Sequence, residues 1–79
     1  MTSNSLADLP VGHDARVVAL CAERDFVKRL HALGFRIGRT VRVIRRAPLS
    51  GPVQIRIGTT DVMLRRREAG NIQIETLAA

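Results

Sequence analysis

Apolar and polar residues alternate along most of the second half of the chain, a pattern typical of β-strands that bury one face. The clearest case is 53–57, where Val53, Ile55 and Ile57 alternate with two polar residues. A run rich in β-branched residues before Glu23 adds a strand in the first half. The pattern predicts five strands, at residues 15–20, 39–46, 53–57, 62–65 and 72–75.

The apolar spacing changes between the first two strands, at residues 25–33. Leu30 and Leu33 lie three positions apart and share a face, which predicts a short helix with one apolar side. Gly34 follows where the C-terminus of a helix favours a left-handed residue, so the helix should end there. Gly38 then permits the backbone to reverse into the next strand.

The remaining segments fix how these elements are connected. Residues 47–52 contain two prolines and a glycine, which favour a loop over a central strand. Ile44 interrupts the alternation of its strand and indicates a bulge or a departure from the core. We expect 6–12 to be an ordered lead-in and 1–5 a flexible tail. Residues 1–79 then form one mainly β domain, a small, partly open, five-stranded antiparallel barrel with one short helix between its first and second strands.

The net positive charge comes from the second half of the chain. The formal net charge is +6, yet basic and acidic residues balance up to Phe35. From Arg36 onward nine arginines accompany three acidic residues. Such a field attracts nucleic acid, an acidic protein surface or anionic lipid without choosing among them. Arginine also covers apolar surface at outward strand positions, so part of the set is expected to be structural only.

The sequence offers little for catalysis or metal binding. Cys21 is the sole cysteine, and neither His13 nor His31 stands at a ligand spacing from it. No nucleophile with an orienting base and no glycine-rich phosphate loop is visible, so we predict no catalytic residues, no metal ligands and no cofactor. A lone thiol, no signal peptide and no apolar run of about 20 residues predict a cytoplasmic protein.

Two groups of residues are candidates for partner binding. Consecutive arginines end two predicted strands and would form one patch if those ends meet. Apolar residues between Gly34 and Gly38 lie in a turn that is expected at the surface, although a place in the core stays open for them. Met63 points outward by alternation. The predicted contact residues are Phe35, Ile37, Met63, Arg45, Arg46, Arg65, Arg66 and Arg67.

The order of these features covers nearly the whole chain and is fairly specific. A helix ends in a leucine-glycine turn, a second glycine and a Pro/Gly loop follow, and an arginine-ended strand precedes a Glu-Ala turn. The chain thereby resembles the FeoA family, small cytoplasmic partners of the ferrous iron transporter FeoB with an SH3-like fold. Arg36 departs from the proline common there, which makes the turn less rigid. The matching segments are 6–12, 29–30, 33–35, 37–38, 41–48, 51–52, 62–66, 68–69 and 72–75.

The resemblance implies a non-enzymatic adaptor that binds FeoB, near the inner membrane, and modulates ferrous iron uptake. The family is associated with transition metal ions, whereas the residues of this chain do not predict a metal site. The same domain occurs appended to metal-dependent repressors, so a stand-alone regulatory domain is one alternative. A basic nucleic-acid-binding barrel is another, weakened because two phenylalanines make a poor stacking platform. Homo-oligomerisation and the direction of regulation stay open.

Overall fold

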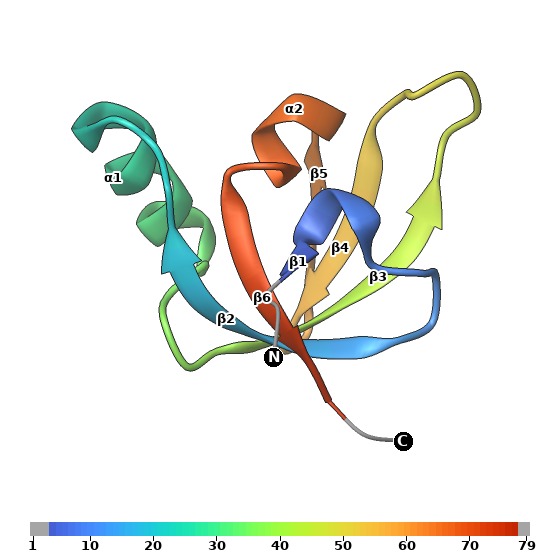
Figure 1. Ribbon diagram of the computed structural model, residues 1–79, viewed down its shortest axis with the longest axis horizontal. Helices are drawn as coiled ribbons and strands as arrows, with labels where there is room; N and C mark the ends of the chain where they lie inside the picture. The colour runs from blue at the N-terminus through green and yellow to red at the C-terminus, as the bar shows by residue number, and fades with distance from the viewer. Residues whose placement is uncertain (1–3, 78–79) are drawn as a thin grey trace.

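A computed structural model describes residues 4–77. Their core is one antiparallel sheet with the strand order β1-β6-β2-β3-β4-β5, and the two edge strands, β1 and β5, do not close it into a barrel (Figure 1). The predicted mainly β, antiparallel architecture is confirmed. The elements are β1 (Asn4–Ser5), the 3₁₀ turn η1 (Leu6–Asp8), β2 (Asp14–Leu20), α1 (Arg24–Leu33), β3 (Thr40–Arg46), β4 (Val53–Ile57), β5 (Thr60–Leu64), α2 (Arg66–Ala69) and β6 (Ile72–Thr76).

The alternating pattern determines which side of each strand faces the core. In β4, Val53, Ile55 and Ile57 are buried, as predicted. β4 and β5 pair as a hairpin, which also agrees with the sequence. The register between β3 and β4 shifts between Val43 and Arg45, so the irregularity expected at Ile44 is confirmed.

The N-terminal segment differs from the prediction. Asn4 and Ser5, expected in a flexible tail, form β1 and pair with Ile74 and Gln73 of β6. This pairing adds a sixth strand that the sequence pattern did not reveal, because two polar residues carry no alternation. Residues 1–3 of the predicted tail lie outside the described residues.

Helix α1 ends as the sequence predicts. Gly34 has a φ of 106°, and its N–H donates to the carbonyl of His31 at 3.0 Å. The N–H of Phe35 donates to the carbonyl of Leu30 at 2.9 Å. These two bonds form a Schellman motif, in which the residue after the glycine packs against the last turn of the helix. Phe35 is consequently buried beside Leu30 in the core.

The core joins the sheet to the segments that cross it. Buried apolar side chains come from β2 to β6, from α1 and α2, and from η1. No helix within residues 4–77 is long and apolar enough to span a membrane. β3 runs between two exposed regions, the turn at 36–39 and the loop at 47–52 (Figure 1). At about 3.3 Å per residue, its seven residues separate these regions by roughly 20 Å.

Candidate functional site

The two arginine-rich strand ends meet at one end of the sheet. β3 ends at Arg46 and β5 ends at Leu64, and both residues pair with Val53 at the start of β4. The strand register therefore brings the ends of β3 and β5 together, as a single arginine patch requires. We call this region the arginine end: it comprises loop 47–52, Met63, Arg45, Arg46, Arg65, Arg66 and Arg67.

Loop 47–52 is the most prominent feature of the arginine end. The N–H of Ala47 donates to the carbonyl of Pro52 at 2.9 Å, and that of Gly51 donates to the carbonyl of Pro48 at 3.2 Å. Between these bonds Leu49 and Ser50 both have positive φ, 59° and 60°. The Leu49 side chain is 99% exposed. The loop thus holds a large apolar side chain away from the protein.

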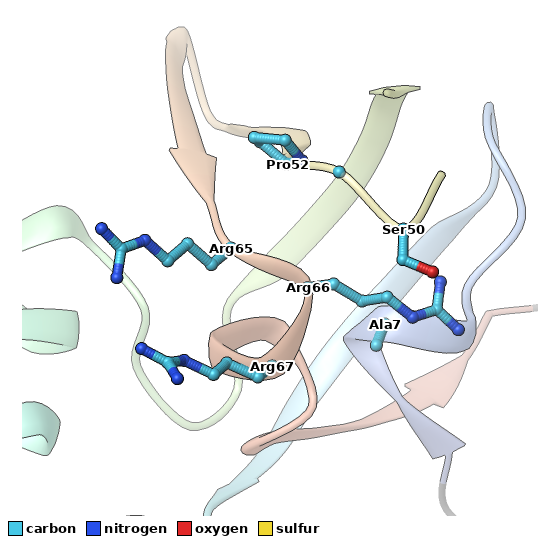
Figure 2. A pocket seen from close by; sticks show the side chains of 7 residues that line it. Ala7, Ser50, Pro52, Arg65, Arg66 and Arg67 are labelled. Atoms are coloured by element: carbon cyan, nitrogen blue, oxygen red, sulfur yellow. The ribbon is translucent and has the colours of Figure 1, made fainter. Parts of the chain in front are cut away.

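A shallow hollow of about 530 Å³ lies between this loop and α2. Figure 2 shows the Arg66 side chain extending along it toward Ser50, whereas Arg65 and Arg67 point to the opposite side. The three guanidinium groups therefore do not converge on one point. The arrangement suits an extended anionic surface better than a single small anion.

The other side of the loop carries Arg45, Arg46 and Met63, which line a second hollow with Pro48 and Pro52. Met63 is 61% exposed, in agreement with its outward position in the alternation. Arg46 is half-buried, and its Nη2 donates to the carbonyl of Leu9. Arg46 therefore holds the lead-in against β3, while Arg45 is exposed.

Phe35 and Ile37 were predicted as neighbouring contact residues, but one is buried and the other is exposed. The expectation that Phe35 is a surface contact is wrong: its side chain is fully buried, because the Schellman motif turns it into the core. Ile37 is 69% exposed. Ile37 comes before the first residue of β3, whereas Met63 of β5 is level with Arg45, near the last residue of β3, with Gln54 of β4 between them. The structure therefore separates Ile37 from Met63 instead of joining them.

A second set of arginines is paired. Positions 14, 42, 56 and 61 lie opposite one another in the order acid, arginine, arginine, acid across four adjacent strands. Arg42 Nε lies 2.6 Å from Asp14 Oδ1, and Arg56 Nε lies 2.8 Å from Asp61 Oδ1. Hydrogen bonds from Arg42 and Arg56 lower the pKa of Asp14 and of Asp61, respectively. We call this row the charge ladder.

The candidate metal ligands lie apart. All three candidates are exposed: His13 comes directly before β2, Cys21 directly after it, and His31 lies on α1. Within residues 4–77, no three His, Cys, Asp or Glu side chains are grouped so that they could hold a metal ion.

A further hollow lies between α1 and α2, and an ion pair connects the two helices there. Arg29 of α1 lies 3.1 Å from Glu68 of α2, and its guanidinium group lies 5.4 Å from the centre of the Phe26 ring. The second Glu68 oxygen accepts a hydrogen bond from the backbone N–H of Arg65 at 2.9 Å. Glu68 is thus fully engaged in holding α2 in place.

Sequence reasoning overlooked Leu49. The sequence does contain an indication that this residue is exposed: it is a leucine inside a Pro/Gly loop, where no strand or helix face is available to bury it. The extent of its exposure depends on the loop conformation, which the composition of the loop does not specify.

The fold and the arginine end define a class: small SH3-like β domains with a basic surface at one end. Residues 4–76 match the family model described as the FeoA domain. The chain belongs to the FeoA domain family.

Similarity to individual proteins agrees with this assignment. A "Fe(2+) transport protein A/Fe(2+) transporter FeoB fusion protein" from Porphyromonas gingivalis is 36% identical over 74 residues, which make up 94% of this chain and 9% of the relative. The solution structure of a FeoA protein from Chlorobium tepidum has a TM-score of 0.87 and 34% identity, covering 94% of this chain and 70% of that one.

One structural neighbour belongs to a different kind of protein. A manganese-dependent transcriptional repressor in complex with manganese has a TM-score of 0.87 at 19% identity, covering 98% of this chain and 38% of the repressor. At this identity the likeness shows the fold alone. The fold is therefore shared between proteins with different names, and function has to be argued from surfaces.

Proposed function

We propose that this protein is a non-enzymatic partner of a FeoB-type Fe(2+) transporter and modulates ferrous iron uptake. The supporting observation is the fusion relative, in which a segment 36% identical to this chain shares one polypeptide with a transporter named FeoB. Fusion raises the effective concentration of two domains for each other, which is useful where they associate. The separate chain would form the same association between two molecules, at the inner face of the membrane.

The surface supports a binding role better than a catalytic one. The arginine end is exposed, its hollows are shallow, and its guanidinium groups point in different directions (Figure 2). Arginines of this kind accelerate encounter with an acidic surface and orient the partner. Among the exposed apolar side chains, either Ile37, which comes before the start of β3, or Met63 on β5 at the arginine end would then make close contact.

Binding to a purified, detergent-solubilised FeoB-type transporter tests this proposal. We expect the wild-type chain to bind, and Ile37→Ser or Met63→Ser to weaken binding at least tenfold, as loss of an interface anchor does. The position that responds identifies the end of β3 that meets the transporter. Unchanged binding by both variants would contradict the apolar contact, and no binding by the wild type would overturn the proposal.

Phe35→Ser must not serve as a binding variant in that experiment. Phe35 is the largest fully buried side chain, and truncation of a buried phenylalanine costs about 3–5 kcal/mol. A loss of binding would then report unfolding. Ile37 and Met63 are exposed, so their variants should keep the wild-type urea midpoint.

Nucleic acid is the main alternative partner for the arginine end. Its charge is suitable, but Phe35 is buried and Phe26 lies against Arg29. Neither ring is free to stack on bases, which sequence-tolerant binding of single strands uses. Titration with oligonucleotides at moderate salt distinguishes nucleic acid from the transporter as the partner. Binding to oligonucleotides without binding to the transporter would favour nucleic acid.

A further inference from the structure

The conformation of Leu49 is costly and yet well supported. A leucine with a φ of 59° lies in the left-handed region, which bulky L-residues rarely adopt. Strained residues persist where the surroundings over-determine them and often mark functional surfaces. Here the flanking prolines and the two hydrogen bonds across the loop supply that support. The chain therefore presents this side chain on a braced loop.

The charges around Leu49 are of one sign. Arg45 and Arg65 each line a hollow with Met63 on one side of the loop, and Arg66 extends toward Ser50 on the other side (Figure 2). Within residues 4–77, these arginines have no carboxylate within 4.0 Å. The neighbouring Glu68 is committed to Arg29 and to the backbone of Arg65. The loop tip is thus an apolar side chain between two groups of free guanidinium groups.

We propose that the arginine end docks on an anionic phospholipid surface, with Leu49 entering the boundary between headgroups and acyl chains. Arg45, Arg65 and Arg66 would then contact lipid phosphates on either side of the loop. Among anionic partners, a bilayer alone offers a continuous field of phosphates with an apolar layer directly beneath it. Nucleic acid satisfies the arginines but leaves Leu49 in water.

The hollow beside the loop fits this geometry. It places Arg66 and the Ser50 hydroxyl along one space of about 530 Å³ (Figure 2). The residues that line this shallow hollow offer both a cation and a hydroxyl to a headgroup phosphate. The long arginine side chains also let the backbone rest at the surface while their charges reach the phosphates.

The expected affinity is that of a peripheral, reversible contact. A basic residue near an anionic leaflet contributes about fivefold in binding, and burial of a leucine side chain contributes about tenfold or more. Several such contributions produce binding that weakens steeply as salt screens the charges.

Co-sedimentation with vesicles tests the inference directly. The probes are phosphatidylcholine vesicles with and without phosphatidylglycerol, at low and at physiological salt. We expect binding only to the anionic vesicles, weakened by salt, and about tenfold weaker for Leu49→Asn. Asparagine tolerates positive φ, so this variant keeps the loop conformation and removes the apolar contact. Ile37→Asn is the matched control, because Ile37 is also exposed but lies at the opposite end of β3.

Each outcome decides the question. Loss with Leu49→Asn and not with Ile37→Asn supports the proposal. No binding of the wild type to anionic vesicles at low salt overturns it, as does equal binding by Leu49→Asn. If vesicles fail while Leu49→Asn weakens binding to the purified transporter, the loop is a protein contact and the lipid proposal is wrong. Because vesicles contain no protein, this experiment can fail without affecting the proposed transporter association.

Discussion

Arg42 and Arg45 lie three positions apart on β3 and illustrate two regions with opposite use of the same residue type. Arg42 belongs to the charge ladder, where Asp14 accepts two of its N–H groups, at 2.6 and 3.2 Å. Arg45 belongs to the arginine end, where it is exposed and the opposite residue on β4 is Gln54. The strand register, and not the composition, decides which arginine is neutralised.

This difference shows which arginines contribute to the net positive charge of the protein and which are neutralised. The ladder contains two acids and two arginines and is neutral, and it connects β2 to β5 across the sheet. The arginine end contributes excess positive charge at the same end of the sheet as an exposed leucine. A contact between like charges, Arg42 opposite Arg56, is tolerated because each has an acid on its outer side.

The largest expected effect comes from removing the charge of the arginine end. The triple variant Arg45→Gln, Arg65→Gln, Arg66→Gln removes the three proposed phosphate contacts and should bind anionic vesicles about a hundredfold more weakly, at about fivefold per arginine. Its urea midpoint should stay near that of the wild type, because the described structure gives these side chains no ion pair. Vesicle co-sedimentation and urea denaturation measure the two quantities.

The double variant Arg42→Gln, Arg56→Gln is the control that separates the two regions. It should keep vesicle binding within a few-fold and lower the urea midpoint. If it loses vesicle binding as strongly as the triple variant, overall charge and not the arginine end controls binding, and the two regions have the same role.

A smaller effect should distinguish the two ends of the ladder. Asp61 accepts hydrogen bonds from Arg56 and from Gln54, whereas among the side chains of residues 4–77 Asp14 accepts them from Arg42 alone. Asp61→Asn should therefore lower the urea midpoint more than Asp14→Asn, and both should leave vesicle binding at or above the wild-type level. The reverse order of midpoints would show that the extra bond from Gln54 adds no stability.

The sequence contained most of the fold because local signals agreed with each other. Alternation in 53–57 identified β4, Gly34 marked the end of α1, and the break at Ile44 anticipated the register shift of β3. Each signal depends on neighbours along the chain, which a single sequence displays. β1 was not predicted because its two residues form a strand only by pairing with β6, which is distant in the sequence.

The site was less predictable, because exposure depends on how the turn is closed. Phe35 was expected at the surface since it lies between two glycines, yet that position after a helix-ending glycine is one that packs back on the helix. The apolar residue that does stand out, Leu49, lies where composition indicated only a loop. The meeting of the two arginine clusters required the register of β3, β4 and β5, which only pairing determines.

The smallest effect is a dependence of stability on pH that belongs to the ladder alone. Hydrogen bonds from Arg42 and Arg56 hold the pKa of Asp14 and Asp61 below the value of about 3.9 expected in the unfolded chain. Their contribution is therefore fully present above that value and is lost as the pH falls through the lower, folded-state values. The urea midpoint of the wild type should exceed that of the double variant Asp14→Asn, Asp61→Asn at neutral pH, and the gap should narrow progressively as the pH falls below the unfolded-state value of about 3.9. Because the pairs are exposed, added salt should also narrow the gap. A gap that persists at low pH would show that the two carboxylates stabilise the sheet by something other than their charge.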